Sequence, residues 1–333
     1  MIGVTIGDVS GIGPEIVIKA LTQIKKPERF ITIIGPKKIL EDINHKIGTR
    51  FSQDFSLLSR VNLVESGGSF SYKFGKAQKQ CGIASALQLH LASHLLKTGK
   101  IKGVVTAPVS KTALAMAGFP FPGQTEYFAT EFGVKKYGML ALKLSETHTS
   151  GLAWSKELKI ILVTIHKPLK DVPKLITEQN VLEKIKLLND YLIHYEKKRK
   201  PKIGVFALNP HAFEFTCGAE DKILKAIRQA RKLGIKADGP IPADSFFSNL
   251  RILESSNLRI AYDGFVAQYH DQGMLPVKLL SQGTGVNTTL GLPFIRTSPL
   301  HGVAFDIAGK NLADPSSMIS AIQLCQKLTQ TKY

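Results

Sequence analysis

Three histidines of the chain, His166, His211 and His270, each come directly after an apolar run that predicts a strand. Any one of them alone would be read as an ordinary core histidine, but the shared placement weakens that alternative. Three neutral imidazoles that converge at one edge of a sheet can hold a divalent metal and leave one coordination position open. A metal held in this way can polarise an alcohol or carbonyl oxygen as a Lewis acid.

The third of these histidines lies in an unusually polar stretch, Tyr269–Lys278, with the sequence YHDQGMLPVK. This stretch follows the apolar run Ile260–Ala267, which predicts a buried strand. Ligands of α/β folds bind beyond the carboxyl ends of strands. The acid Asp271 and the lysine Lys278 are therefore candidate site residues together with His270.

Lys278 is followed at equal intervals by Asn287 and Arg296, and Asn287 falls in a Gly- and Thr-rich segment that predicts a loop, Gly283–Gly291. A lysine, an arginine and an amide are suitable ligands for a phosphate group. The alternative is that these are three unrelated polar residues on the surface. Spacing alone does not decide between the two interpretations.

Two further segments place polar groups at predicted helix starts. The segment Thr106–Lys111 (TAPVSK) combines a strand end, a proline and a lysine at the start of a helix. The segment Gly123–Glu126 (GQTE) opens another helix, where Thr125 can present a hydroxyl and an N-terminal amide to an anion.

The N-terminal turn Gly7–Glu15 is rich in glycine, which permits a tight turn, and Pro14 and Glu15 suit the first turn of a helix. The alternative is a purely structural strand-to-helix turn. The sequence contains neither GxGxxG nor GxxxxGK[ST]. A standard Rossmann or P-loop nucleotide site is therefore not expected.

The elements that must position these residues alternate between strand and helix along the chain, which predicts a largely parallel α/β sheet. The clearest predicted strands are 2–6, 30–34, 103–106, 158–164, 202–207 and 260–267, and the clearest predicted helices start at 14, 36, 82 and 178. The segments 119–123 and 283–293 are the expected crossings between two lobes.

The composition is that of an ordinary globular protein, with 333 residues and a net charge of +18. A nucleic-acid surface is one interpretation of this charge, but the lysine runs lack interleaved aromatics, so a solvated surface that also attracts anionic substrates is favoured. No run of apolar residues is long enough to predict a membrane span. Three widely separated cysteines and no secretory signal favour the cytoplasm.

Taken together, these segments resemble the 4-hydroxythreonine-4-phosphate dehydrogenase family of pyridoxal phosphate biosynthesis. The resemblance covers essentially the whole chain and is carried by TIGDVSGIGPEI, TAPVSK, FPGQTEYFA, TIHKPL, LNPHAFE, GPIPAD, YHDQGMLPVK, NTTLGLPFIRTS and HGVAFDIAG. It implies an α/β fold like that of isocitrate and isopropylmalate dehydrogenases, with two lobes around a cleft and a nicotinamide cofactor bound without GxGxxG. The expected lobes are 1–128 with 296–333, and 129–295, the second carrying the metal ligands and the dimer interface.

The resemblance also implies the roles of site residues. The metal ligands are His166, His211 and His270, and the substrate-binding residues are Gln124, Thr125, Lys278, Asn287 and Arg296, with the last three chiefly on the phosphate. The family's active site lies at a homodimer interface that shares the metal ligands between partners. The general base is not identified by sequence, and its candidates are Lys111, Asp244 and Asp271.

The implied reaction is the oxidation of the C3 hydroxyl of 4-phosphohydroxy-L-threonine by NAD or NADP. The β-keto acid then loses carbon dioxide to give 3-amino-2-oxopropyl phosphate, in pyridoxine 5'-phosphate biosynthesis. The expected metal is zinc, with magnesium, cobalt and iron as alternatives. The expected partners are a small phosphorylated amino-acid substrate and a second copy of the chain, with neither nucleic acid nor membrane.

Three segments depart from the family pattern. Gln124 stands where the family usually has histidine, so this side chain can form hydrogen bonds but cannot exchange a proton near neutral pH. Leu300 and Val303 replace the usual aspartate and threonine around His301, and Val9-Ser10 replaces Pro-Ala. Three alternatives remain open: the same chemistry on erythronate or threonate 4-phosphate, an inactive paralogue, or a basic nucleic-acid-binding protein on an enzyme-derived fold.

Overall fold

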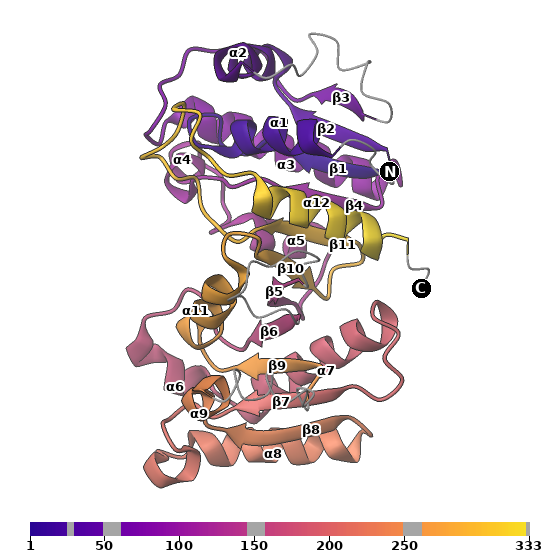
Figure 1. The fold of residues 1–333 in the computed structure, drawn as a ribbon, viewed down its shortest axis with the longest axis vertical. Helices are drawn as coiled ribbons and strands as arrows, with labels where there is room; N and C mark the ends of the chain where they lie inside the picture. Colours follow the sequence, from indigo (N-terminus) through magenta and orange to yellow (C-terminus); the bar gives the residue numbers. More distant parts are fainter. Residues whose placement is uncertain (25–29, 49–60, 145–156, 249–261, 331–333) are drawn as a thin grey trace. The chain divides into compact units, whose positions relative to one another are not determined.

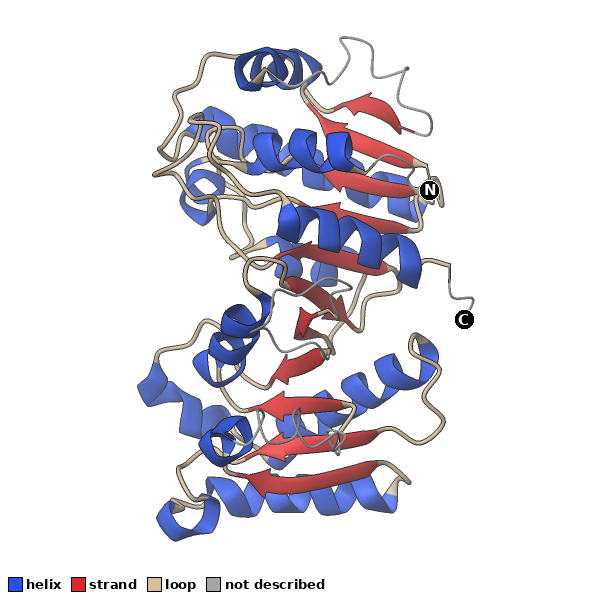
Figure 2. Cartoon of the chain, in the orientation of Figure 1, coloured by secondary structure: helices blue, strands red, loops and turns tan. Residues whose placement is uncertain are grey.

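The computed structural model describes residues 1–24, 30–48, 61–144, 157–248 and 262–330. The chain divides into two compact units, residues 1–135 with 292–332 (unit 1) and residues 136–291 (unit 2). Helices and strands alternate in both units (Figure 2). The predicted α/β fold class is therefore confirmed.

Unit 1 is built on five parallel strands in the order β3-β2-β1-β4-β11. Val4 of β1 lies opposite Ile33 of β2 on one side and Val105 of β4 on the other. The strands are β1 (Ile2–Thr5), β2 (Ile31–Gly35), β3 (Val61–Glu65), β4 (Gly103–Thr106) and β11 (Ile295–Pro299). The helices are α1 (Gly13–Gln23), α2 (Lys37–Ile47), α3 (Lys79–Lys97), α4 (Lys111–Met116), α5 (Gln124–Glu131) and α12 (Ser316–Leu328).

The strand order of unit 1 reverses between β1 and β4, because β2 lies on one side of β1 and β4 on the other (Figure 1). At this position the loop after β1 meets the loop after β4, where the Asp8 amide donates to the Pro108 carbonyl at 3.0 Å. Gly7 has φ 72°, and a Cβ there would lie 2.3 Å from the Pro108 oxygen. Only glycine therefore allows the two loops to approach this closely.

Unit 2 has six strands in the order β10-β5-β6-β9-β7-β8, in which β5 is antiparallel to both neighbours and the other pairs are parallel. The strands are β5 (Gly138–Lys143), β6 (Leu158–Leu162), β7 (Lys202–Phe206), β8 (Lys236–Ile241), β9 (Gly264–Ala267) and β10 (Val286–Leu290). The helical segments are η2 (Leu169–Asp171), α6 (Val172–Leu175), α7 (Glu178–His194), η3 (Ala212–Phe215), α8 (Ala219–Lys232), α9 (Ala243–Ser248) and α11 (His270–Ser281).

Local sequence explains where several of these elements begin and which face they bury. The Thr177 hydroxyl caps α7 by accepting from the Asn180 amide at 3.1 Å, and the Ser110 hydroxyl caps α4 in the same way. Every residue of β6 is buried, as expected for a strand between two neighbours in a covered sheet. The predicted strand 260–267 is observed from Gly264, and its first two residues lie outside the described residues.

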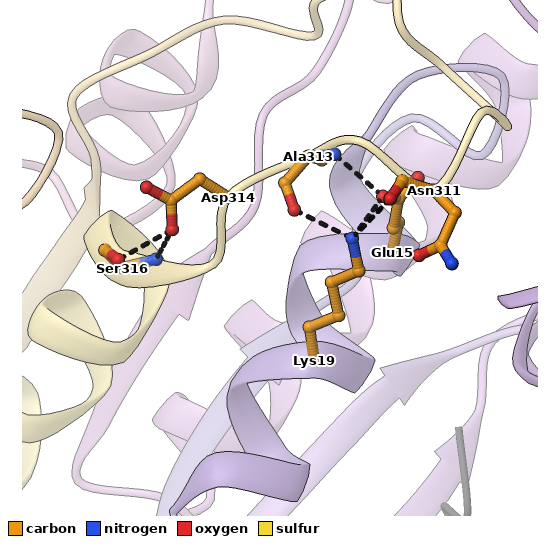
Figure 3. A network of polar contacts seen from close by, with 6 residues as sticks. All are labelled: Glu15, Lys19, Asn311, Ala313, Asp314 and Ser316. Carbon is orange, nitrogen blue, oxygen red and sulfur yellow. Dashed lines mark hydrogen bonds and ion pairs between the residues drawn. The ribbon is translucent and has the colours of Figure 1, made fainter. Parts of the chain in front are cut away.

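A polar clamp fixes the C-terminal loop of unit 1 onto α1 (Figure 3). Lys19 Nζ donates to Glu15 Oε1 at 2.8 Å and to the carbonyls of Asn311 and Ala313 at 3.1 and 2.9 Å. The Ala313 amide in turn donates to Glu15 Oε1 at 2.9 Å. Because the Glu15 side chain is only 4% exposed, its charge depends on these donors.

Lys19→Met is therefore expected to destabilise unit 1 by about 1–3 kcal/mol, because it leaves two carbonyls and a buried carboxylate short of a donor. That loss corresponds to a fall of at least a few degrees in the thermal unfolding midpoint. Lys38→Met is the matched control, since Lys38 pairs with Asp42 on the exposed face of α2 and such pairs contribute under about 1 kcal/mol. Equal shifts in the two variants would show that the clamp does not stabilise the fold.

In the part of the chain that the structure describes, no helix is long and apolar enough to cross a membrane. The three cysteines all lie within this part and are free, with Cys81 and Cys325 buried and Cys217 exposed.

Candidate active site

The three predicted metal ligands lie at one edge of unit 2. The strands β6, β9 and β7 are adjacent and parallel, so their carboxyl ends meet at the same edge (Figure 1). His166 lies a few residues beyond β6, His211 a few residues beyond β7, and His270 begins α11 shortly after β9. The sheet topology therefore brings together three histidines that are far apart in the sequence.

Two of these imidazoles are close neighbours, and two have a carboxylate on Nδ1. The ring centroids of His166 and His270 lie 5.5 Å apart. His270 Nδ1 lies 2.7 Å from Asp271 Oδ1, and His211 Nδ1 lies 3.1 Å from Glu214 Oε2. A histidine whose Nδ1 donates to a carboxylate presents Nε2 as a metal ligand of raised basicity.

The backbone at two of the histidines is in the left-handed region, with φ 45° at His166 and φ 54° at His211. Residues other than glycine rarely adopt this conformation, and they do so chiefly where the surrounding structure enforces it, often at functional sites. The predicted strand 158–164 is observed as β6 only to Leu162. The Val163 and Thr164 amides still donate to the carbonyls of Ala267 and Gln268, at 2.8 and 3.2 Å.

The donor set fits a divalent metal in chemistry, since it consists of imidazoles oriented by acids at a sheet edge. Among the described residues of one chain, no three His, Cys, Asp or Glu side chains are arranged to hold a metal ion. His166 and His270 form a pair, whereas the His211 ring contacts Glu214 and Phe215, the latter with centroids 5.6 Å apart.

In unit 1 a buried arginine gathers side chains from three elements. Arg296 of β11 is 4% exposed, and its two terminal nitrogens donate to Thr125 Oγ1 at 2.7 Å and Thr106 Oγ1 at 3.0 Å. Burial lowers the pKa of its guanidinium to about 10, and the nearby Glu126 carboxylate opposes this shift. A buried cation held by hydroxyls is suited to bind an anion, because an anion compensates its lost hydration.

Gln124 and Lys111 lie beside this arginine cluster. Gln124, the first residue of α5, donates from Nε2 to the Ala107 carbonyl at 3.1 Å, and its buried Oε1 has no hydrogen-bond partner among the described residues. The Lys111 side chain is exposed at the start of α4, and its Cε lies 3.8 Å from where a Cβ on Gly123 would be. Unit 1 thus brings together Lys111, Gln124, Thr125 and Arg296.

The other predicted residues lie in unit 2. Lys278 is exposed on α11, Asp244 is exposed on α9, and Asp271 holds the His270 ring. Asn287 lies in β10 opposite Ala141, and its buried Oδ1 has no partner among the described residues. The predicted loop around Asn287 was wrong, because the β-branched run Val286–Leu290 pairs with β5 and the glycines only flank it.

Sequence reasoning missed several residues that the structure assigns to these clusters. Thr106 was noted only as a strand end, yet its hydroxyl accepts from Arg296. Glu214, which sequence reasoning did not name, lies at Nδ1 of His211, and Asp271, which was predicted as a site residue, lies at Nδ1 of His270. An acid three residues after His211 was the signal that could have identified Glu214.

The fold is the α/β fold of isocitrate dehydrogenases. An isocitrate dehydrogenase from Methylococcus capsulatus superposes with a TM-score of 0.50 over 99% of this chain and 87% of its own, at 14% identity, which shows the fold alone. The predicted likeness to isocitrate dehydrogenase in fold is confirmed.

The chain belongs to the PdxA family, because the family model described as pyridoxal phosphate biosynthetic protein PdxA matches residues 18–325. It is 37% identical, over 99% of both chains, to a 4-hydroxythreonine-4-phosphate dehydrogenase from Sulfurihydrogenibium. The crystal structure of 4-hydroxythreonine-4-phosphate dehydrogenase from Klebsiella pneumoniae superposes with a TM-score of 0.81 at 32% identity, covering 99% of this chain and 98% of its own. A protein from Oceanobacillus iheyensis named "Putative D-threonate 4-phosphate dehydrogenase" is also 37% identical, over 100% of this chain and 98% of its own.

Proposed function

We propose that this protein is an NAD(P)-dependent dehydrogenase that oxidises 4-phosphohydroxy-L-threonine at C3, after which the β-keto acid loses carbon dioxide to give 3-amino-2-oxopropyl phosphate. The reaction belongs to pyridoxine 5'-phosphate biosynthesis. The observation that carries the proposal is the row of parallel strand ends bearing His166, His211 and His270 in a PdxA-family chain. The name of the Sulfurihydrogenibium relative supports the same substrate.

In this proposal His166, His211 and His270 hold one divalent metal, with zinc as the first choice and magnesium or cobalt as alternatives. A metal held by these residues would supply Lewis-acid stabilisation of negative charge on a substrate oxygen. The contribution of the chain is to fix the ligands, since Asp271 and Glu214 hold two of the rings by Nδ1.

A homodimer completes the ligand set in this proposal, with histidines from both copies around one metal. The pairing of His166 with His270, while His211 makes separate contacts, supports a shared site. Large apolar side chains on the segments that carry these histidines are also exposed, at 58% for Phe215, whose ring contacts that of His211, and 74% for Leu279 on α11. Exposed apolar groups around polar ligands are typical of a surface that a second chain covers.

The substrate phosphate binds to Arg296 and Thr125, with Gln124, Lys278 and Asn287 as the other substrate contacts. The buried guanidinium of Arg296 supports this assignment, because an anion would relieve the cost of keeping it charged. Three candidates remain for the general base. Lys111 and Asp244 are exposed, whereas Asp271 is already bonded to His270.

The nicotinamide cofactor binds at the carboxyl edge of the unit 1 strands, beside the β1/β4 reversal. Open α/β sheets bind ligands where the strand order reverses. Two loops meet there, and Gln88 fixes one of them. Its Oε1 accepts from the Gly7 amide at 2.8 Å, and its Nε2 donates to the Gly7 carbonyl at 2.9 Å. We place the protein in the cytoplasm, where its three free cysteines stay reduced.

The test is the production of NADH or NADPH from 4-phosphohydroxy-L-threonine by the purified protein, with zinc, cobalt, magnesium or a chelator present. Metal-dependent reduction of either cofactor is the expected result. A protein that turns over none of the offered phosphorylated acids under any of these conditions would contradict the proposal and favour the inactive paralogue.

D-Threonate 4-phosphate is the second candidate substrate, and two observations favour it. The Oceanobacillus relative carries that name, and Gln124 stands where histidine is usual in the family. Comparing kcat/KM for 4-phosphohydroxy-L-threonine with kcat/KM for D-threonate and erythronate 4-phosphates separates these candidates.

Gln124→His is expected to change kcat/KM for 4-phosphohydroxy-L-threonine by less than about tenfold and to add no new ionisation to the pH–rate profile. The reason is that Gln124 donates a hydrogen bond to the Ala107 carbonyl, which a neutral imidazole can also do. The measurement is a pH–rate profile of both proteins. A larger gain, with a new limb near the ordinary histidine pKa of about 6.5, would indicate that the natural substrate is a different acid.

A further inference from the structure

The strand ends that carry the three histidines are joined by side-chain amides rather than by the backbone ladder alone. Regular pairing of β9 ends at Ala267, opposite Leu162 of β6, and at Val266, opposite Val205 of β7. On the β6 side two backbone bonds continue past this pair, from the Val163 amide to the Ala267 carbonyl at 2.8 Å and from the Thr164 amide to the Gln268 carbonyl at 3.2 Å. Two glutamines of the stretch that follows β9, Gln268 and Gln272, span this region.

On the β7 side both glutamines donate to the end of the strand. Gln268 Nε2 donates to the Phe206 carbonyl at 2.7 Å, and Gln272 Nε2 donates to the Ala207 carbonyl at 2.7 Å. Gln272 Oε1 also accepts from the Gln268 amide at 2.8 Å. The first turn of α11, which begins with His270, is thereby tied to the segment that leads to His211.

On the β6 side Thr164 makes the corresponding link. Its amide and its hydroxyl both donate to the Gln268 carbonyl, at 3.2 and 2.8 Å. Thr164 lies two residues before His166. Gln268 is therefore bonded through its carbonyl to the segment before His166 and through its side chain to the segment before His211.

This belt of hydrogen bonds is made by Thr164, Gln268 and Gln272, of which Gln272 is partly exposed. Gln268 is fully buried and Thr164 nearly so. A Cβ on Gly273 would lie 2.5 Å from Leu162 Cδ2 and 3.0 Å from Ile160 Cγ2, so a glycine here favours the close approach of α11 to β6. Buried hydrogen bonds of this kind leave an unsatisfied carbonyl when a donor is removed, and they hold their partners at fixed separations.

We propose that Gln268 and Gln272 are positioning residues of the metal site, which hold the segments bearing His166, His211 and His270 in place at the sheet edge of each copy. The inference rests on the histidine site of the proposed function and adds the residues that hold its ligands in place. Neither glutamine touches the metal in this proposal. They act through the backbone of the segments that carry its ligands, chiefly by tying the first turn of α11 to the segment that leads to His211.

The test uses Gln272→Met, which keeps the length and helix propensity of the side chain and removes both of its hydrogen bonds. Titration of the metal-free protein with Co²⁺ gives an affinity and a visible absorption spectrum that reports ligand geometry. The variant is expected to bind Co²⁺ about 10–100-fold more weakly, as is usual when residues that support metal ligands are lost. Its bound spectrum is expected to differ from that of the wild type.

Gln229→Met is the matched control, because Gln229 is an exposed helical glutamine of the same unit on α8. It is expected to bind Co²⁺ as the wild type does. A Gln272→Met protein that has only a lower unfolding midpoint, with unchanged Co²⁺ affinity and spectrum, would overturn the inference and leave these amides a purely structural role.

Thr164→Val supplies a second variant in case Gln272→Met does not fold. It removes one hydroxyl donor and leaves the Thr164 amide bonded to the Gln268 carbonyl, so a smaller loss of Co²⁺ affinity, about threefold or more, is expected. Unchanged affinity and spectrum in this variant would also overturn the inference. Wild-type protein that binds no Co²⁺ would overturn the proposed histidine site itself, which is a different outcome from wild-type binding with unaltered variants.

Discussion

His211→Ala is expected to abolish stoichiometric metal binding and to lower kcat/KM by at least about 100-fold. Loss of a residue that supports a metal ligand typically costs 10–100-fold in affinity or activity, so loss of a ligand should cost more. The backbone of His211 is in the left-handed region, which is unfavourable for residues other than glycine, and its ring contacts Glu214. The measurement is elemental analysis of dialysed protein together with the NAD(P)H assay.

His94→Ala is the control for this variant, because His94 is exposed on α3 in the other unit and alanine is a good helix former. It should keep the metal content and the activity of the wild type. If His211→Ala also keeps both, the assignment of His211 as a ligand is wrong. If it keeps the metal but loses activity, His211 has a role in the chemistry other than coordination.

Arg296→Ala is expected to lower kcat/KM for the phosphorylated substrate by about two decades or more and to leave the cofactor affinity nearly unchanged. Loss of a charge-assisted hydrogen bond costs about 1.5–3 kcal/mol, and this arginine can offer more than one to a phosphate. Lys278→Ala should cost less, because Lys278 is exposed and its charge is screened by water.

Arg296→Lys separates charge from geometry. A lysine keeps the positive charge but cannot reach Thr125 and Thr106 with two planar N–H groups, as Arg296 does. It should therefore recover only part of the loss. Cofactor titration by fluorescence measures the second property, and equal losses of cofactor and substrate affinity in Arg296→Ala would place the arginine in a different pocket.

The depressed pKa of Arg296 also fixes the sign of its contribution to stability. Its folded pKa of about 10 lies below the ordinary 12.5, so the fold disfavours the charged form. This cost is fully present at neutral pH and is relieved as the pH rises through about 10 toward 12.5. A bound phosphate opposes the same cost at neutral pH, so it should raise the unfolding midpoint of the wild type more than that of Arg296→Ala.

Much of the fold could be predicted because the apolar runs that form strands are local signals. The predicted strand at 103–106 has the same bounds as β4, and the helix predicted from residue 178 begins there as α7. The end of β6 was predicted two residues too late, and the left-handed backbone at His166 was not predicted from the local sequence. Asn287 was placed in a loop because glycines surround a short strand whose partner lies far away in the chain.

The candidate site was predictable in its residue types but not in its contacts. The motif blocks identified the histidines, Arg296 and Thr125, yet the bond between Arg296 and Thr106 joins residues 190 positions apart. No spacing rule indicates such a pair. The same holds for Gln268 and Gln272, whose amides read as ordinary polar residues until their acceptors at Phe206 and Ala207 are seen.

Unit 1 consists of two stretches of chain separated by the whole of unit 2, and this arrangement affects the order of events during synthesis. The strand β11 pairs with β4 and places Arg296 opposite Val104, so the arginine cluster cannot form until almost the entire chain has left the ribosome. Unit 2 is continuous in sequence and can fold while β4 still lacks its neighbour β11. The nascent protein therefore passes through a stage in which the histidine edge can already form while one side of β4 is still unpaired. An unpaired strand edge favours misfolding at this stage.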